Sequence, residues 1–369
     1  MFILHISKNI CNFASIFQKR GAKVLLFLIR TKKFLIFFKK NFMRKVLGLG
    51  NALTDMLLSV NEQELLELGL PKGSMSLVNY DTALALQNRF ADRKKTMVAG
   101  GSASNTINTI ARLGGKAAFI GKIGNDHVGK FYLDDMFNNG VTPVLFPSTL
   151  LSGCCTVLIT PDGERTFATY LGAASDMRAE DINEDMFDGY DIFHIEGYLV
   201  QNHQLIEKAV KYASEAGLKI SIDLASYNTV NGHYSFLHNL VREYVDIVFA
   251  NEDESFAYTG LEPIESAEQI SKECDIAVVK VGKHGSYIQR GTESVHIDAI
   301  TSNCVDSTGA GDLYAGGFLF GLANDYDIER CGRIGTLAAG RVVETVGTKL
   351  SDSTWNEICA YVNSFASRL

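Results

Sequence analysis

One short stretch, Asp306-Ser307-Thr308-Gly309-Ala310-Gly311-Asp312, leads directly into the apolar residues 313–322. Its small residues predict a tight loop, and the apolar run predicts a helix that starts near Ala310. The first backbone N–H groups of a helix lack intrahelical partners and carry the positive end of the helix dipole, so they suit a phosphoryl group. Asp312 would lie beside them, where its carboxylate can accept a hydroxyl proton. The alternative is that Asp312 only balances the helix dipole.

Around this stretch, short apolar runs alternate with helical patterns. Several runs are almost wholly apolar, as in strands of a parallel sheet that helices cover on both faces. The alternation predicts an α/β fold with a doubly wound, mostly parallel sheet, which binds ligands beyond the carboxyl ends of its strands. The expected strands are residues 45–50, 117–121, 156–160, 192–195, 219–223, 247–250 and 276–281, and the expected helices are 102–113, 128–139, 203–216, 252–258, 310–322 and 328–345.

Two segments, residues 60–80 and 141–174, interrupt the alternation. They contain short alternating pieces and turn residues but no long helix. We expect them to form a small β-rich lid set against the main domain, which would span residues 43–369. Ordinary surface insertions are the alternative.

Residues 1–42 differ from the rest in charge. They hold nine Lys or Arg and no Asp or Glu, so the formal charge of −7 for the whole chain becomes −16 for the other 327 residues. Met43 opens an ordinary protein start, and we expect residues 1–42 to be an upstream mis-start or a disordered tail. Their apolar runs are far shorter than the roughly 20 residues that span a bilayer, although an amphipathic surface anchor is an alternative. The acidic body argues against nucleic-acid binding.

Missing motifs narrow the class of protein further. The 7 cysteines are scattered without a Cys-x-x-Cys pair, which is typical of reduced thiols in a cytoplasmic protein. The sequence also lacks a Cys/His cluster of the kind that binds zinc. A Walker-type phosphate loop, a complete dinucleotide fingerprint and a nucleophile elbow are also absent from the sequence. These absences argue against a P-loop enzyme, a Rossmann dehydrogenase and a serine hydrolase.

Polar groups also follow two early strands. Gly50-Asn51-Ala52-Leu53-Thr54-Asp55 places a carboxylate where it can accept hydrogen bonds from neighbouring hydroxyls of a polyol. Gly100-Gly101-Ser102-Ala103-Ser104-Asn105 precedes a predicted helix. Paired glycines let the backbone approach a ligand closely, and the side chains of Ser102 and Asn105 can hold sugar hydroxyls. Plain turns with a helix-surface Asn are the alternative.

Two later turns suit a metal ion and phosphates. Asn251-Glu252-Asp253-Glu254 follows a predicted strand and can hold hydrated Mg²⁺, mainly through Glu254 and Asn251. Helix capping by the same residues is the alternative. Val281-Gly282-Lys283-His284-Gly285-Ser286 suits nucleotide phosphates and equally suits a hairpin.

In this order, the elements resemble the ribokinase-like sugar and nucleoside kinases, the PfkB carbohydrate kinase family, over residues 43–369. The resemblance rests on Gly100-Gly101-x-x-x-Asn105, Asn251-x-x-Glu254 and Asp306-x-x-Gly309-Ala310-Gly311-Asp312. Ala338-Ala339-Gly340-x-Val342 also looks like the nucleotide-side helix of the family. Ser307 departs from the usual Thr but keeps a hydroxyl.

The resemblance implies an ATP-dependent phosphotransferase that uses Mg²⁺, with dependence on a monovalent cation such as K⁺ left open. Asp312 would activate a primary hydroxyl, and the backbone N–H groups of Gly309, Ala310 and Gly311 would form the anion hole. Lid strands of this family often pair between subunits, which implies a homodimer. The resemblance places Asn51, Leu53, Asp55, Gly100, Gly101, Ser102, Asn105 and Arg165 around the substrate, Lys280, Gly282, Gly285, Thr308 and Ala339 around the nucleotide, and Glu254 with Asn251 around Mg²⁺.

The substrate is expected to be a nucleoside similar to adenosine. The stretches at residues 50–55 and 100–105 look closer to adenosine kinases than to ribokinase or fructokinases, and so do residues 162–166 and 169–173. Tyr170 and Leu171 would form an apolar wall for a base, and Arg165 would clamp a phosphate or a sugar. A free sugar or a sugar phosphate is the alternative within the family. A non-catalytic ligand sensor is a further alternative, but a sensor could lose Asp312 or Glu254, and this chain keeps both.

Overall fold

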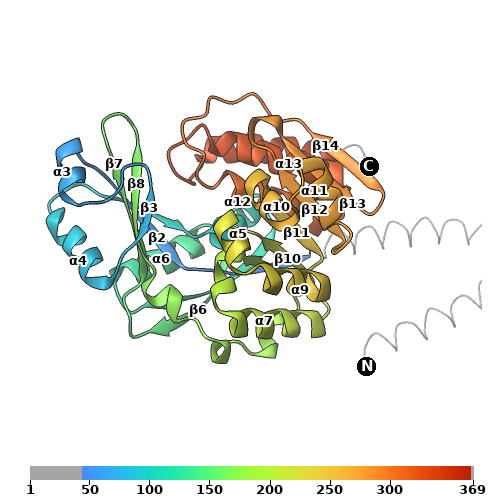
Figure 1. Ribbon diagram of the computed structural model, residues 1–369, viewed down its shortest axis with the longest axis horizontal. Coiled ribbons are helices and arrows are strands. Elements are labelled where there is room, and N and C mark those ends of the chain that lie inside the picture. The colour runs from blue at the N-terminus through green and yellow to red at the C-terminus, as the bar shows by residue number, and fades with distance from the viewer. Residues whose placement is uncertain (1–43, 367–369) are drawn as a thin grey trace, which may run out of the picture. The chain divides into compact units, whose positions relative to one another are not determined.

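The computed structural model describes residues 44–366, and the expected tail at residues 1–42 lies outside the described residues. None of the helices within residues 44–366 combines the length and the apolar character that a membrane crossing requires. The described chain is built around two sheets of different size (Figure 1).

The larger sheet has nine strands in the order β14-β13-β12-β11-β10-β9-β1-β5-β6. The seven strands from β6 across to β12 pair in parallel, whereas β13 pairs antiparallel with both of its neighbours, β12 and β14. This arrangement confirms the predicted doubly wound, mostly parallel sheet. The strands are β1 (Lys45–Leu49), β5 (Lys116–Gly124), β6 (Thr142–Ser148), β9 (Ile192–Glu196), β10 (Lys219–Asp223), β11 (Ile247–Asn251), β12 (Ile276–Lys280), β13 (Ser286–Arg290) and β14 (Glu293–Ile297).

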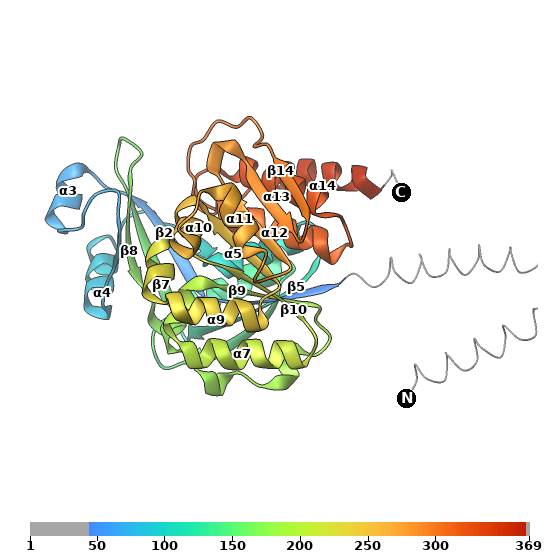
Figure 2. The same ribbon diagram turned by 45° about the vertical axis from the view of Figure 1, so that its right-hand side comes forward.

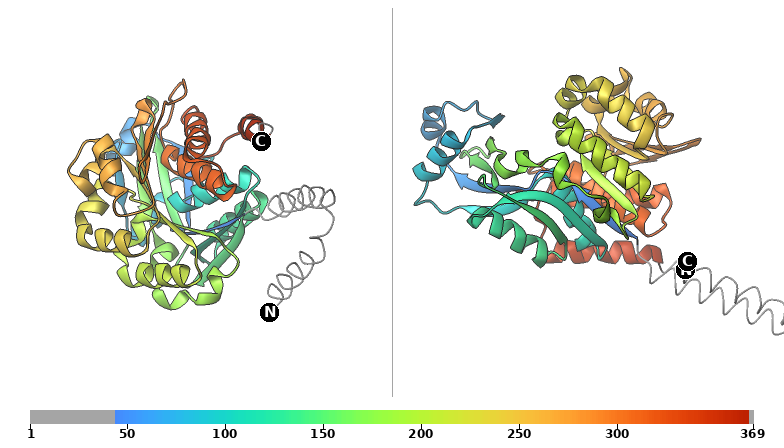
Figure 3. Two further views of the ribbon diagram at one scale, coloured as in Figure 1. Left: turned by 90° about the vertical axis from the view of Figure 1, so that its right-hand side faces the viewer. Right: turned by 90° about the horizontal axis from the view of Figure 1, so that it is seen from below.

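Helices cover both faces of this sheet, as the views in Figures 2 and 3 show. Successive side chains of a strand point to opposite faces. Val46 of β1 accordingly packs into one apolar core, and its neighbour Leu47 packs into the other. The first core is closed by α5 (Ser102–Arg112), α6 (His127–Asn138), α12 (Ala310–Ala323), α13 (Ile328–Val342) and α14 (Asp352–Ala366), and the second by α7 (His203–Glu215), α8 (Tyr227–Gly232), α9 (Tyr234–Tyr244), α10 (Glu252–Thr259) and α11 (Pro263–Ile270).

The smaller sheet, called the small sheet below, has five strands in the order β3-β8-β7-β2-β4. Helices α3 (Glu62–Glu67) and α4 (Tyr80–Arg89) pack on one of its faces through a separate apolar cluster that includes Leu65 and Leu86. In Figure 1 it lies at the left, beside the larger sheet. Its strands are β2 (Leu53–Ser59), β3 (Met75–Leu77), β4 (Thr96–Gly100), β7 (Gly153–Ile159) and β8 (Arg165–Tyr170).

The expected lid segment at residues 141–174 is divided between the two sheets. Its first part is β6, which belongs to the larger sheet, and only the part from Gly153 onward enters the small sheet. This part contains Pro143 and Pro147. They fit β6 because it is an edge strand, where a missing N–H costs little. The strands β2 and β4 complete the small sheet from outside both expected segments.

Candidate active site

Asp312 lies in the first turn of α12, directly against the start of α5. Its Oδ1 accepts a hydrogen bond of 2.7 Å from the Ser102 hydroxyl, and its Oδ2 accepts one of 2.8 Å from Asn105 Nδ2. The Thr106 hydroxyl donates to the backbone carbonyl of Asp312 at 3.1 Å. Burial raises the pKa of Asp312 to about 6, although the two side-chain hydrogen bonds act in the opposite direction. Two motifs that lie far apart in the sequence therefore meet at one buried carboxylate.

The loop before Asp312 leaves free a slightly different set of amides from the one that the sequence predicts. Gly309 has a φ of 75° at the N-cap of α12, and the Ala310 amide donates to the Ser307 carbonyl at 3.2 Å. Within residues 44–366, the amides of Gly309, Gly311 and Asp312 have no hydrogen-bond partner. The positive end of the helix dipole is therefore open to an anion at these three positions, whereas the Ala310 amide is occupied.

Asp306 holds this loop in place. Its Oδ1 accepts from both the amide and the hydroxyl of Thr308, at 3.0 and 2.7 Å. Its Oδ2 accepts from the Gly347 amide at 2.7 Å and from Arg165 Nη1 at 2.6 Å. Arg165 begins β8, so this ion pair joins the small sheet to the loop before Asp312. The sequence analysis assigned no role to Asp306.

Asp55 lies on the small sheet, close enough to Asp306 and Asp312 for their charges to affect it. Burial raises its pKa to about 7 against the opposing effect of Arg165, and the charges of Asp306 and Asp312 raise it further. A Cβ on Gly100 would approach Asp55 Oδ2 to 3.0 Å, so Gly100 lies close beside this carboxylate. Pairing with β7 and β4 puts Asp55 on one face with Cys155 and Val98, and Leu53 lies two residues before it on that face.

Tyr170 lies on the opposite face of the small sheet, contrary to the expected base-binding wall. It pairs in register with Cys154, whereas Thr169 pairs with Cys155 on the face of Asp55. The ring of Tyr170 lies 6.0 Å from that of Tyr80, beside a cavity of about 170 Å³ near α4 and α6. An alternating strand offers two faces, and the sequence does not show which of them meets the site.

Glu196, at the end of β9, is a buried site residue that the sequence analysis missed. It accepts hydrogen bonds from the Asn51 amide and the Ala103 amide, both at 3.0 Å, and from Asn51 Nδ2. Burial raises its pKa to about 7. Asn51 is thus tied to the start of α5 through Glu196. The signal was present, since a carboxylate directly follows the apolar strand predicted at residues 192–195.

A buried ion pair closes the other side of the site. Lys280 Nζ, at the end of β12, donates to Asp223 Oδ2 at 2.7 Å. Asp223 ends β10, which is separated from β12 by β11. Burial alone would lower the pKa of Lys280, but the carboxylates of Asp223 and Glu254 hold it above its usual value. A Cβ on Gly311 would lie 3.0 Å from Lys280 Nζ, so this cation reaches the start of α12.

Asn251 and Glu254 form a helix capping box. The Glu254 amide donates to Asn251 Oδ1 at 2.9 Å, and the Asn251 amide and Nδ2 each donate to the Glu254 carboxylate at 2.7 Å. Burial, followed by the Asp223 charge, raises the pKa of Glu254 to about 7. The same residues line a cavity of about 530 Å³ together with Glu252, Asp253, Asp223, Lys280 and Asp312.

This carboxylate-rich cavity fits a hydrated cation. Mg²⁺ prefers oxygen ligands, keeps several of its waters and is usually held by one or two carboxylates plus substrate phosphates. Within residues 44–366, no group of three or more His, Cys, Asp or Glu is arranged to hold a metal ion. A nearby cation would also favour the ionised form of Glu254. The donor set therefore suits an ion that is carried largely by phosphate oxygens.

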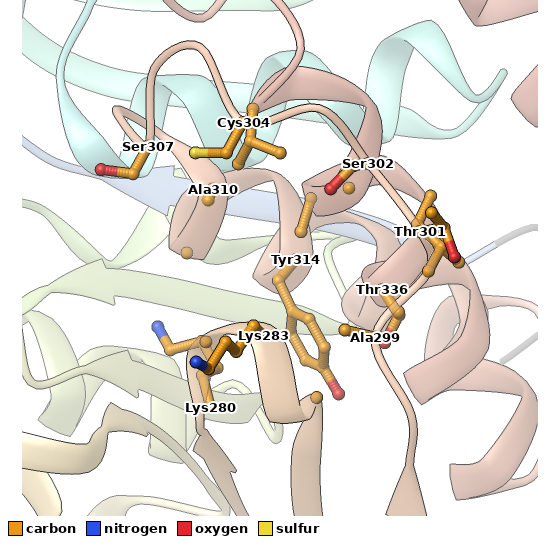
Figure 4. A pocket seen from close by; sticks show the side chains of 17 residues that line it. Lys280, Lys283, Ala299, Thr301, Ser302, Cys304, Ser307, Ala310, Tyr314 and Thr336 are labelled. Atoms are coloured by element: carbon orange, nitrogen blue, oxygen red, sulfur yellow. The ribbon is translucent and has the colours of Figure 1, made fainter.

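A second cavity, of about 540 Å³, adjoins the first at Lys280 and Gly311 (Figure 4). Of the expected nucleotide residues, Lys280, Gly282, Gly285 and Ala339 line it, whereas Thr308 does not. The turn at residues 281–286 joins the antiparallel strands β12 and β13, so it is both a hairpin and a cavity wall. The sequence analysis missed the wall residues Ala299, Ile300, Thr301, Ser302, Cys304, Tyr314 and Thr336.

The chain is similar to one family description and to several sugar and adenosine kinases. The pfkB family carbohydrate kinase description matches residues 75–355. A probable sugar kinase from Rhizobium etli CFN 42 has a TM-score of 0.78 and 32% identity, covering 87% of this chain and 99% of that chain. The adenosine kinase from Sinorhizobium meliloti has a TM-score of 0.77 and 33% identity, covering 86% and 99%. An uncharacterized sugar kinase from Archaeoglobus fulgidus is 27% identical over 257 residues, 65% of this chain and 96% of the relative.

The fold, the site and these likenesses define an ATP-dependent kinase of carbohydrates or nucleosides. The chain belongs to the PfkB family of carbohydrate kinases. This family implies the use of ATP, typically with Mg²⁺, and a small-molecule acceptor.

Proposed function

We propose that the protein transfers the γ-phosphoryl group of ATP to a primary hydroxyl of a nucleoside similar to adenosine, with Asp312 as the base. The observation that carries this proposal is the position of Asp312. Asp312 lines the carboxylate-rich cavity, which adjoins the second cavity at Lys280 and Gly311. It also lies close enough to Asp55 of the small sheet for its charge to raise the pKa of Asp55. A hydroxyl and a phosphoryl group can therefore meet at one carboxylate.

In this proposal the chain's own residues do three things. Ser102 and Asn105 orient the Asp312 carboxylate so that it accepts the hydroxyl proton as the oxygen attacks. The amides of Gly311 and Asp312, at the helix start, stabilise the negative charge of the transferring group. Lys280 adds a positive charge within reach of the same point. Mg²⁺ held near Glu254 would neutralise phosphate charge.

The lining of the small sheet supports a nucleoside over a free sugar. In register, Leu57 of β2 pairs with Val157, which pairs with Phe167 of β8, and all three share the face of Asp55. Leu53 and Val98 extend this apolar face around the carboxylate. A nucleoside presents hydroxyls to Asp55 and an apolar base plane to such a surface, whereas a free sugar presents hydroxyls on most of its edges. The likeness to a probable sugar kinase keeps a sugar or sugar phosphate as the second candidate.

The test is ADP release with MgATP from the full chain, using adenosine, inosine, guanosine, ribose, fructose and fructose-6-phosphate as acceptors. Turnover with a nucleoside would support the proposal. Turnover with sugars alone would keep Asp312 as the base but overturn the nucleoside assignment. A protein that binds ATP without turning over any acceptor would favour the sensor.

The activity should fall at acid pH because the base works only when it is deprotonated. With the pKa of Asp312 near 6, we expect kcat/KM to reach its plateau above pH 7 and to fall about tenfold for each pH unit below about 6. Ser102→Ala removes a hydrogen bond that lowers this pKa, so it should move the acid limb to higher pH. A profile that is flat down to pH 5, or a limb that Ser102→Ala leaves in place, would contradict the role of Asp312.

Phe167 should contribute to the affinity for a base. Phe167→Ala removes apolar area from the face of Asp55, and we expect KM for the nucleoside to rise about tenfold, since one apolar contact is worth roughly 1–3 kcal/mol. Tyr170→Ala, on the same strand but the opposite face, is the matched control and should leave KM within about twofold. Equal effects of the two variants on initial-rate kinetics would count against a base-binding face.

The proposal also covers the assembly, the motion, the location and the ion requirement of the protein. We include a homodimer formed through the small sheet, whose edge strand β3 exposes Met75 and Leu77. We also include closure of the small sheet over the substrate as a lid. A cytoplasmic location is a further part of the proposal, and the free cysteines of the described chain favour it. Dependence on K⁺ is supported by the family resemblance alone.

A further inference from the structure

The nucleotide-side cavity has a thiol in its wall. Cys304 is exposed to solvent and lies in the segment between β14 and α12. It lines the cavity of about 540 Å³ together with Ser307, Ala310 and Lys283. Figure 4 shows Cys304 on the same side of this cavity as Ser307 and Ala310. A group attached to its sulfur would therefore project into space at the start of α12.

A second observation indicates that this cavity takes a ligand. Thr336 is only 7% exposed and lines the cavity, and within residues 44–366 its hydroxyl has no hydrogen-bond partner. A buried hydroxyl without a partner costs free energy, so a polar ligand at this position would satisfy it. The wall of Ala299, Ile300, Tyr314 and Thr336 and the cations of Lys280 and Lys283 suit a group that has an apolar plane and an anionic end.

The other cysteines of the described residues differ from Cys304. Cys154, Cys155 and Cys331 are buried, and Cys274 and Cys359 are half-buried with their thiols directed to backbone carbonyls. Burial raises the pKa of Cys154 and Cys274 to about 12 and also raises the pKa of Cys155, Cys331 and Cys359. A thiol reacts as its thiolate and needs access to solvent, so these five thiols should react slowly.

We propose that Cys304 is a modification site for low-molecular-weight disulfides and that its modification and nucleotide binding exclude each other. The inference rests on the assignment of this cavity to the nucleotide in the proposed function. In the reaction, the Cys304 thiolate attacks one sulfur of the disulfide and a new S–S bond forms. The old S–S bond breaks, and the leaving thiolate takes up the proton that Cys304 lost. A thiol reductant reverses the exchange.

An adduct on Cys304 and a nucleotide would compete for the same space and the same positive charges. The same cavity has both Cys304 and Gly311 in its wall, so a glutathionyl group on Cys304 would enter it and cover the approach to the Gly311 amide. Lys280 and Lys283 attract the carboxylates of such a reagent, as they would attract phosphates. The adduct and the nucleotide would thus use the same space and the same cations.

The experiment uses the full chain carrying Cys11→Ser, because Cys11 lies outside the described residues. Native protein is treated with DTNB, and the released thiolate is followed with and without MgATP or MgADP. Cys304→Ser in the same background is the test variant, and Cys359→Ser is the matched control. Nucleotide binding to the unmodified protein is measured separately by calorimetry, so that a cavity that binds no nucleotide is recognised as a failure of the proposed function.

We expect one fast thiol per chain, lost in Cys304→Ser and kept in Cys359→Ser. Nucleotide at ten times its Kd should slow the fast phase about tenfold, since only about a tenth of the chains remain free. Treatment with glutathione disulfide should add one glutathionyl group by mass and abolish nucleotide binding, and a thiol reductant should restore it. A fast phase that persists in Cys304→Ser, or nucleotide that binds without slowing the fast phase, would overturn the proposal.

Discussion

Asp312→Asn is expected to lower kcat by about 10³- to 10⁴-fold, the upper part of the range for losing a positioned general base. An amide cannot take the hydroxyl proton, whereas the amides of Gly311 and Asp312 and the cation of Lys280 remain in place. The Kd for ATP should therefore change little. Initial rates with each acceptor, together with ATP binding by calorimetry, separate loss of chemistry from loss of binding.

The fold should survive this substitution. Asn has nearly the shape of Asp, and burial disfavours the charged form of Asp312, so the neutral amide removes a desolvation cost while it disturbs the hydrogen bonds from Ser102 and Asn105. We expect the free energy of unfolding to change by no more than about 1–2 kcal/mol. Normal turnover in a folded Asp312→Asn protein would show that another group is the base.

The apolar pattern of the sequence predicted six of the nine strands of the larger sheet, whereas β6, β13 and β14 were not among the expected strands. Strand β10 has the predicted bounds, Lys219–Asp223, because nearly every residue in it is buried and its two ends are polar. Helices α5 and α12 begin at the predicted residues, Ser102 and Ala310. In each case the signal is local, since a buried run and its boundary lie within a few residues of each other.

The small sheet and the contacts of several site residues depend on pairing between segments that lie far apart in the sequence. Glu196 and Asp223 are single carboxylates, and their importance follows only from the groups that neighbouring strands bring to them. The role of Arg165 depends on Asp306, 141 residues away. Tyr170 was expected at the site because its residue type suits a base, but the register of β7 and β8 puts it on the other face.

Gly101→Ala is expected to have the largest effect on stability. The sequence analysis explained Gly101 by the close approach of a ligand, but the structure shows a close approach of the chain to itself. A Cβ on Gly101 would lie 2.2 Å from the backbone oxygen of Asn51, and the residue has a φ of +94°. The Asn51 oxygen belongs to the backbone, and the new Cβ is fixed directly to the backbone of residue 101. No flexible side chain can yield, so the backbone itself must move.

We expect Gly101→Ala to lower the free energy of unfolding by about 2–4 kcal/mol, of which about 1 kcal/mol reflects the left-handed backbone and about 1–3 kcal/mol the overlap. Gly114→Ala is the matched control, because Gly114 has a φ of +88° with nothing within 4 Å of its Cβ position. It should cost only the backbone part, about 1 kcal/mol. Urea unfolding of both variants gives the two values.

The same substitution should also impair catalysis in the protein that remains folded. Gly101 directly precedes Ser102, and Asn51 is tied through Glu196 to the Ala103 amide at the start of α5. Pushing the Asn51 carbonyl away from Gly101 therefore shifts Ser102 and Asn105 relative to Asp312. We expect kcat to fall at least tenfold under conditions in which most of the Gly101→Ala protein is folded, because small displacements at a reacting centre have large effects on rate. Unchanged kcat would show that the contact between Asn51 and Gly101 supports the fold without positioning the base.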